Sequence, residues 1–266
     1  MEVFQFRSGP APLLVSMPHI GTELPPGLAE RMTAAGRLLA DTDWRVDQLY
    51  DFLDDLGANV IEARYSRYVI DLNRPPDGQP LYPGASNTEL CPVSTFEEEP
   101  IYLPGQAPGE DEVAQRRTDF WAPYHARIAE CLEEIRARHG HALLWDAHSI
   151  RSRAPRFFDG KLPDLNIGTA SGTSASPRTI AAVAGAAAAA APAYSHVVDG
   201  RFKGGYITRR YGRPAEGTEA IQLELSWATY MDEAPPFTFR DDLAAGIRPV
   251  LRDMLAAALG AQPKGR

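Results

Sequence analysis

Two histidines stand where apolar runs of the chain end. His19 follows the run PLLVSM at residues 12–17, and His148 follows the run ALLWDA at residues 142–147. Short apolar runs that are closed by turn residues are typical of buried strands. In open α/β sheets, ligands bind beyond the carboxyl ends of the strands, so two histidines at two such ends can converge on one metal ion.

A metal ion that takes part in hydrolysis needs a third protein ligand. Catalytic zinc sites combine three His or carboxylate ligands with an open fourth position for water. The motif DTDW supplies two carboxylates, Asp41 and Asp43. The pattern therefore predicts a metal site of His19, His148 and one of these carboxylates. A structural role stays open for each histidine, because a lone histidine after a strand is more often simply hydrogen-bonded.

The elements that must position these residues are short apolar runs alternating with longer helical patterns, which indicates an α/β fold. The predicted strands cover residues 12–17, 58–66, 67–73 (continuous with the previous strand or separate from it), 141–150, 195–202 and 220–227. The predicted helices cover residues 40–57, 111–139, 179–194 and 240–259. The stretch 75–110 lacks periodicity and is rich in Pro, Gly, Ser and Asn. A loop of that length is usually functional.

Composition excludes several classes of partner. The 266 residues carry a formal net charge of -8, with 44% hydrophobic and 23% charged residues. This balance is that of an ordinary globular protein, and the acidic charge argues against a nucleic acid or an anionic membrane as partner. The two cysteines, Cys91 and Cys131, lie far apart and suggest a reducing compartment. With neither a secretory signal nor a membrane span in the sequence, we expect a single cytoplasmic domain that acts on a small molecule, of unknown oligomeric state.

Seven blocks of sequence occur in order between about residues 12 and 235. They are SMPHIGTELP, DTDWRVDQLYDF, ARYSRYVIDLNRP, LLWDAHSIRS, LPDLNIGT, GRFKGGYITRRYGRP and QLELSWATYMDE. Together they resemble the N-formylglutamate amidohydrolase (N-formylglutamate deformylase) family. The resemblance implies a zinc-dependent hydrolase that cleaves N-formyl-L-glutamate into formate and L-glutamate, in a histidine-degradation route.

The resemblance also implies a fold and a ligand set. The fold is a three-layer α/β/α domain with a mixed central sheet, similar to zinc carboxypeptidases and aspartoacylase. The sequence departs from the HxxE spacing of those relatives, because Glu23 stands one residue too far from His19. Asp43, inside the block DTDW, is therefore preferred over Glu23 as the third ligand beside His19 and His148, and Asp41 and Glu23 stay open as alternatives. Zn²⁺ is the expected ion, although Mn, Fe or Co would suit the same donors.

Two further residues are expected to act on the amide itself. Glu224, in the apolar run IQLELSW, is similar to the late-strand glutamate that serves as general base in carboxypeptidase-like families. The alternation of this strand also permits a solvent-facing Glu224. Asp146, in WDAHS, is the next candidate for the base. By similarity to aspartoacylase, Arg67 polarises the scissile carbonyl.

Basic residues predict the choice of substrate, since a guanidinium pairs with a carboxylate through two parallel hydrogen bonds. The resemblance assigns Asn73 and Arg74 to one substrate carboxylate. A Gly-rich loop adds candidates for the second carboxylate: Lys203, Arg209, Arg210 and Arg213. The alternative for each of these four is a solvated surface position.

Two other functions stay open. One is a hydrolase for the N-acyl or N-formyl group of another acidic amino acid, which would use the same metal and arginines. The other is a non-catalytic binding protein for acidic metabolites, which would keep the histidines and have no need of Glu224 as a base.

Overall fold

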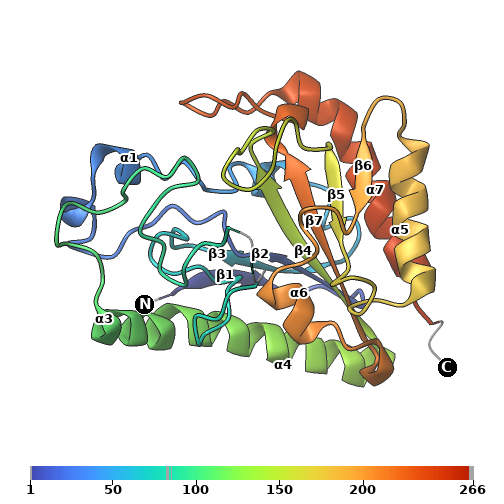
Figure 1. Ribbon diagram of the computed structural model, residues 1–266. Helices are drawn as coiled ribbons and strands as arrows, with labels where there is room; N and C mark the ends of the chain where they lie inside the picture. The colour runs from blue at the N-terminus through green and yellow to red at the C-terminus, as the bar shows by residue number, and fades with distance from the viewer. Residues whose placement is uncertain (1, 82–83, 85, 264–266) are drawn as a thin grey trace.

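A mixed sheet crosses the protein (Figure 1), and in this computed structural model residues 2–81, 84 and 86–263 are described. Within those residues the sheet has seven strands in the order β1-β3-β2-β4-β7-β5-β6. The strands are β1 (Phe4–Arg7), β2 (Leu13–Met17), β3 (Asn59–Ala63), β4 (Ala142–Ile150), β5 (Leu165–Gly168), β6 (His196–Val198) and β7 (Thr218–Ser226). Strands β3, β2, β4 and β7 are mutually parallel, whereas β1 pairs antiparallel with β3 and β5 pairs antiparallel with β7.

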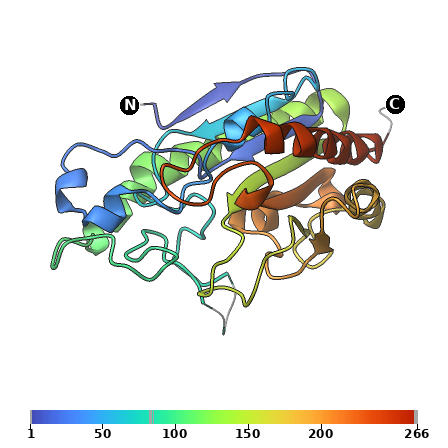
Figure 2. The ribbon, with the colours of Figure 1, turned by 90° about the horizontal axis from the view of Figure 1, so that it is seen from above.

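Helices cover both faces of the sheet. They are α1 (Ala34–Arg37), α2 (Val46–Leu49), α3 (Glu110–Arg116), α4 (Ala122–His139), α5 (Pro177–Ala189), α6 (Tyr206–Tyr211) and α7 (Asp241–Gly260). Helix α4 contacts β2, β3 and β4 along one face, while α5 and α7 pack together on the other (Figure 1). Seen from above, α5 and α7 lie next to each other, with α5 end on (Figure 2). The predicted three-layer arrangement with a mixed central sheet is therefore confirmed. None of the helices in the described ranges has the length and apolarity needed to cross a membrane.

Side-chain alternation in the central strands explains where a site can form. Odd-numbered residues such as Leu143 and Leu223 enter the core under α5 and α7, and even-numbered residues such as Leu144 and Ala220 enter the core under α4. Toward the carboxyl ends of the strands, the even-numbered positions become polar. These positions are Ser16, Asp146, His148, Gln222 and Glu224, all buried. The α4 face of the sheet thus changes from an apolar core to a polar floor at its carboxyl edge.

Most predicted elements are confirmed, with two corrections. The predicted helix at 40–57 is wrong, because only Val46–Leu49 is helical and turns follow it. Arg45 adopts a left-handed backbone conformation with φ 60°, which ends helical geometry on the amino side. The acidic residues Asp51, Asp54 and Asp55 would stand at the carboxyl end of the helix, where its dipole disfavours negative charge.

The predicted strand at 67–73 is also wrong, because this segment forms turns rather than a paired strand. Its apolar residues Tyr68, Val69 and Ile70 are buried, which produced the strand-like pattern. The helical stretch predicted at 111–139 is confirmed in three parts: α3, a π-helical turn (Arg117–Trp121) and α4, which ends at Gly140. The long stretch predicted as a loop at 75–110 is a loop in its described residues up to Gly109, and α3 begins at Glu110.

Candidate active site

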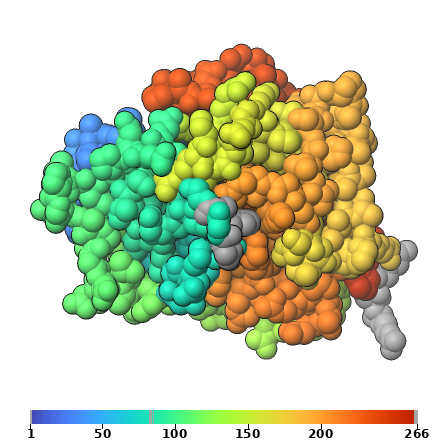
Figure 3. All heavy atoms as spheres, viewed as in Figure 1, coloured from blue at the N-terminus to red at the C-terminus, as the bar shows by residue number. Residues whose placement is uncertain are grey.

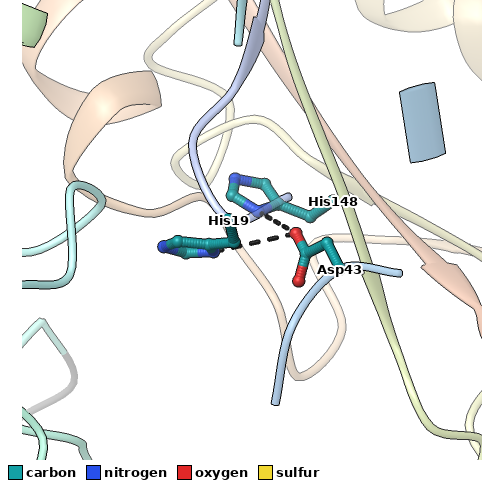
Figure 4. Close-up of side chains that lie close together, drawn as sticks. All are labelled: His19, Asp43 and His148. Carbon is teal, nitrogen blue, oxygen red and sulfur yellow. Dashed lines mark hydrogen bonds and ion pairs between the residues drawn. The ribbon is translucent and has the colours of Figure 1, made fainter. Parts of the chain in front are cut away.

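Two histidines and one aspartate meet at the carboxyl edge of the sheet (Figure 4). His19 follows β2, His148 lies near the end of β4, and Asp43 comes from the loop before α2. The backbone N–H of Asp43 donates to the carbonyl oxygen of His19 (3.0 Å), which fixes the two segments together. One ligand atom from each of the three buried side chains lies within 4.8 Å of the others. The structure therefore brings the three residues of the predicted metal site together.

Each imidazole is oriented by a carboxylate on its far side. Asp71 Oδ1 lies 2.7 Å from His19 Nε2, and Asp146 Oδ2 lies 3.0 Å from His148 Nε2. The two Nδ1 atoms face Asp43 Oδ2, at 3.7 Å from His19 and 3.0 Å from His148. A carboxylate that accepts the Nε2 proton leaves the Nδ1 lone pair for a metal ion. Two imidazole nitrogens and one carboxylate oxygen in this arrangement fit a divalent transition metal.

Charges in this group stabilise one another. Burial opposes ionisation of Asp71, but the Arg67 guanidinium and His19 hold the pKa of Asp71 well below its usual range. Burial likewise opposes ionisation of Asp43, and hydrogen bonds from His148 and His19 hold the pKa of Asp43 below its ordinary value. Burial disfavours the charged form of His148, yet Asp146 and Asp43 raise the pKa of His148 well above 6.5. Buried carboxylates thus attract a positive charge at this position.

The other two ligand candidates lie elsewhere. Asp41 accepts hydrogen bonds from the Tyr68 hydroxyl (2.7 Å) and the Phe96 backbone N–H (2.8 Å). Glu23 pairs with Arg64 at the surface (2.8 Å). Among the described residues, neither carboxylate belongs to the group formed with the two histidines.

Glu224 lies beside the histidine group in the neighbouring strand. It is the register partner of His148 across the parallel pair β4–β7, and the same face of the sheet carries both side chains. Its exposed fraction is 9%, so the solvent-facing alternative is wrong. Burial raises the pKa of Glu224 to about 8, with Asp43 and Asp146 acting in the same direction and His148 and Arg67 opposing them.

The segment after β3 contributes two arginines that share one partner. Arg67 Nη2 donates to Asp71 Oδ2 at 2.6 Å, and Arg67 Nη1 lies 4.0 Å from Asp43 Oδ1. Arg74 Nη1 lies 3.8 Å from Asp71 Oδ2, while its Nη2 donates to the Thr88 hydroxyl. Through Asp71, which holds His19, both guanidinium groups are connected to the histidine group.

Asn73 is buried, with both ends of its amide engaged. Its Nδ2 donates to Asp146 Oδ2 (3.0 Å), and its Oδ1 accepts from the Ile207 backbone N–H (2.8 Å). A Cβ at Gly205 would lie 2.4 Å from Asn73 Nδ2, so glycine is required for this close approach. The structure places Asn73 at the pocket wall, where its role toward substrate stays a prediction.

A pocket with about 580 Å³ of empty space, part of it open to solvent, joins these residues. His19, His148, Glu224, Arg67, Asn73 and Arg74 all line it. The lining also includes residues that the sequence did not single out: Asn87, Phe96, Phe157, Arg201, Phe202 and Gln222. Among the described residues, the loop before α3 contributes four to the lining: Leu81, Ser86, Asn87 and Phe96.

The four basic residues of the Gly-rich loop are placed differently from the prediction. Within the described part of the chain, the lining does not include Lys203, Arg209, Arg210 or Arg213. Arg213 Nη1 donates to the carbonyl oxygens of Arg209 and Gly212 at the end of α6. Arg210 is exposed and lies over the Tyr211 ring. Their binding of a substrate carboxylate stays a prediction without support from this geometry.

Side chains of the long helix hold the segment that carries Arg67, Asp71, Asn73 and Arg74. Four side-chain donors of α3, the π turn and α4 reach backbone carbonyls of residues 69–76: Arg116 to Val69, His125 to Leu72, Trp121 to Arg74 and Arg117 to Pro76. The Trp121 and His125 rings stack with centroids 3.7 Å apart. These contacts replace the sheet hydrogen bonds that the segment lacks.

A Trp121→Phe variant tests whether this helix positions the site. Phenylalanine keeps a ring against His125 and removes the N–H that donates to the Arg74 carbonyl (3.0 Å). An unsatisfied carbonyl costs about 1–3 kcal/mol. Where this cost falls on the ligand-bound state, we expect the KM of the molecule that binds in the pocket to rise by about 5–200-fold. Steady-state kinetics would measure this, with the exposed Arg138→Ala on the same helix as control. A lower melting temperature with unchanged KM would show that Trp121 only stabilises the fold.

Comparisons with known proteins point to one family. The family model for N-formylglutamate amidohydrolase matches residues 11–231. The chain is 51% identical to N-formylglutamate deformylase of Pseudomonas aeruginosa, over 97% of this chain and 96% of that protein. It is 50% identical to N-formylglutamate deformylase of Pseudomonas putida with the same coverage. The crystal structure of N-formylglutamate amidohydrolase from Ralstonia eutropha JMP134 matches with a TM-score of 0.78 at 25% identity, over 98% of this chain and 97% of that chain.

Proposed function

The chain belongs to the N-formylglutamate amidohydrolase family, and we propose that it hydrolyses N-formyl-L-glutamate to formate and L-glutamate in the pocket described above. The observation that carries this proposal is the buried group of His19, Asp43 and His148, with Glu224 beside it in the next strand. A non-catalytic binding protein would have no use for a buried carboxylate at that place.

His19 Nδ1, His148 Nδ1 and Asp43 Oδ2 would hold one divalent ion, and Zn²⁺ is the ion we propose for this donor set. When bound, zinc lowers the pKa of a coordinated water to near neutrality and polarises a carbonyl group. Asp71 and Asp146 would hold the two imidazoles in the tautomer that this role requires by accepting the Nε2 protons, and Asn73 Nδ2, which also lies 2.8 Å from His148 Nε2, would then donate to Asp146 alone.

Glu224 is the proposed proton carrier. The carboxylate accepts a proton from the attacking water as the water oxygen bonds to the formyl carbon. Glu224 then donates this proton to the amide nitrogen as the carbon–nitrogen bond breaks. Its burial keeps competing water away, and its place beside His148 aims the carboxylate at the same end of the pocket.

The arginines near the histidine group are proposed to act on the substrate. Arg67, close to both Asp71 and Asp43, is placed to donate to the formyl oxygen as negative charge develops there. Arg74, at the pocket wall, pairs with the substrate α-carboxylate, with Asn73 beside it.

We expect Arg74→Ala to act on substrate affinity. Hydrogen bonds to charged groups contribute about 1.5–3 kcal/mol, so KM for N-formyl-L-glutamate should rise by about 10–200-fold. Metal content should stay that of the wild-type protein, because no ligand atom is removed. Steady-state kinetics and elemental analysis measure the two quantities, with Arg64→Ala at the surface as control. An unchanged KM would remove Arg74 from the binding site.

A substrate panel tests the proposed activity. N-formyl-L-glutamate, N-formyl-L-aspartate and N-acetyl-L-glutamate differ by one methylene or one methyl group, and released formate, or acetate for the acetyl compound, reports turnover. The proposal predicts the highest kcat/KM for N-formyl-L-glutamate. Preference for either of the other two compounds would assign the site to another acidic N-acyl amino acid.

Other observations support the proposed domain organisation, cellular location and kind of partner. Strands from both halves of the described chain enter one sheet, which supports a single hydrolase domain. Cys91 and Cys131 are buried free thiols, which supports a reducing, cytoplasmic location. The net charge of -8 supports a small molecule rather than nucleic acid as partner.

A further inference from the structure

Arg201 is an arginine of the pocket wall that comes from a different segment of the chain than Arg67 and Arg74. It follows β6 and lines the same pocket as His19, His148 and Glu224. Its Nε donates to the Phe157 carbonyl oxygen (2.7 Å) and its Nη2 to the Ser86 carbonyl oxygen (3.1 Å). These two acceptors of Arg201 are backbone carbonyls, whereas Arg67 and Arg74 are joined to the histidine group through the carboxylate of Asp71.

Aromatic side chains hold the Arg201 guanidinium in place. Its central carbon lies 5.7 Å from the centroid of the Phe157 ring and 5.6 Å from that of the Phe202 ring. Phe157 and Phe202 belong to a small apolar cluster that also contains Phe96 and Ile150. Two aromatic rings and two backbone carbonyls therefore fix the direction of the guanidinium.

Three separate segments build this part of the wall. They come from the loop before α3, the loop after β4 and the loop after β6, and they adjoin on one face of the molecule (Figure 3). Arg156 ties the first two together, since it donates to the Ser94 hydroxyl and the Thr95 carbonyl oxygen. Arg156 does not line the pocket, among the residues that the structure describes.

The two carboxylates of N-formyl-L-glutamate can be compared with the two arginines, Arg74 and Arg201, of the pocket lining. In N-formyl-L-glutamate, the α-carboxylate is attached next to the amide nitrogen, whereas the side-chain carboxylate is two methylene groups farther away. With the formyl group at the histidine group, the α-carboxylate reaches Arg74, which is linked to that group through Asp71. The methylene groups would then lie along Phe96, which faces Arg67, and Phe157, which contacts Phe96 and faces Arg201, so that the second carboxylate would meet the Arg201 guanidinium.

We propose that Arg201 binds the side-chain carboxylate of the substrate and selects for an acidic side chain, a proposal that rests on the proposed function. A planar guanidinium stacked on aromatic rings presents an edge that suits a carboxylate. The charge also disfavours neutral side chains, because they offer the guanidinium no charged acceptor. This assignment replaces the predicted clamp of Lys203, Arg209, Arg210 and Arg213 by one arginine slightly earlier in the same segment.

A pair of substrates separates this role from a structural one. N-formyl-L-glutamine has the length of N-formyl-L-glutamate and lacks only the side-chain charge. For Arg201→Gln, we expect kcat/KM for N-formyl-L-glutamate to fall by about 10–200-fold, as for loss of one charged hydrogen-bonded pair. We expect kcat/KM for N-formyl-L-glutamine to change by less than about 3-fold, within the scatter of a neutral contact. For Arg201→Lys, which keeps the charge and loses the planar edge, kcat/KM for N-formyl-L-glutamate should lie between the values of the wild-type protein and Arg201→Gln.

Arg156→Gln is the matched control, because it loosens the same loops through an arginine outside the pocket lining. It should affect both substrates equally. Calorimetric titration with L-glutamate and L-glutamine adds a readout that needs no turnover, and Arg201→Gln should weaken binding of L-glutamate alone. Equal losses for both substrates in Arg201→Gln would overturn the proposal, since Arg201 would then support the loops or bind the α-carboxylate. Absence of formate release by the wild-type protein would instead contradict the proposed function itself.

Discussion

Replacing Glu224 by glutamine is expected to lower kcat for N-formyl-L-glutamate by about 10²–10⁴-fold, the range of general acid–base catalysis. Glutamine keeps the volume and polarity of the side chain and cannot accept the proton of the attacking water. KM and metal content should change little, because Glu224 is outside the proposed ligand set. Single-turnover and steady-state measurements of formate release would give both parameters.

Glu219→Gln supplies a matched control for this variant. Glu219 is a buried glutamate of the same strand, at its other end, and its carboxylate accepts a hydrogen bond from Gln262. The Glu219→Gln variant should have a lower melting temperature and an unchanged kcat. Near wild-type turnover by Glu224→Gln would remove Glu224 as the base, and Asp146, the carboxylate that contacts His148 Nε2, would be the next residue to replace.

The pH dependence should follow from the same role. A general base must be ionised, so kcat/KM rises as the pH rises through the pKa of Glu224 and is lost below it. Burial raises the pKa of Glu224 to about 8 in the protein without a metal ion, and a bound cation lowers it. The acid limb of the pH profile is therefore expected below about pH 8 in the metal-loaded enzyme. This limb should be absent from the residual activity of Glu224→Gln.

The second large effect is expected from Asp43→Asn, which should release the metal ion. Asparagine preserves the shape of the ligand and removes the negative charge that faces both Nδ1 atoms. Loss of a ligand should exceed the about 10–100-fold loss of affinity seen when a residue behind a ligand is changed. Elemental analysis after dialysis should find wild-type metal content near one ion per chain and a strongly reduced content in the variant.

Two variants of the alternative ligands sharpen this experiment. Asp41→Asn and Glu23→Gln should keep the wild-type metal content, since these carboxylates bond to Tyr68 and Arg64 instead. Asp41→Asn should lower thermal stability, because a buried acceptor of two hydrogen bonds is altered. Metal loss in Asp41→Asn, together with retention in Asp43→Asn, would reverse the assignment.

Much of the fold follows from local patterns. The strands at residues 12–17, 141–150 and 220–227 are apolar runs with both faces buried, and their length and composition suffice to predict them. The buried residues Val46, Leu49 and Leu53 have helical spacing, yet the predicted helix at 40–57 forms only at Val46–Leu49, because Arg45 has a left-handed backbone conformation and turns follow Leu49. The predicted strand at 67–73 does not form, because side chains from a helix about fifty residues away bind its backbone carbonyls. The sequence of the segment itself gives no indication of these partners.

Part of the site could be predicted from the rule that ligands bind beyond the carboxyl ends of strands, which indicates His19 and His148. The choice between Asp41 and Asp43 could not, because it depends on how the loop before α2 folds back onto the His19 carbonyl. The sequence analysis assigned no role to Asp71. Its place in the motif DLNRP, two residues before Asn73, is the only feature of the sequence that could have indicated one. Arg201 stood in GRFKGG between a glycine and an aromatic residue, and only its place in the pocket lining distinguishes it from the arginines that follow.

The most direct test of the account is formate release from N-formyl-L-glutamate by one preparation in three states: as purified, after removal of metal with a chelator, and after addition of Zn²⁺. The account predicts that chelation abolishes most of the release and that about one equivalent of Zn²⁺ per chain restores it, as expected for a single three-ligand site. The Asp43→Asn protein should not be restored by the same addition. Undiminished formate release by protein verified to be free of metal would contradict the account.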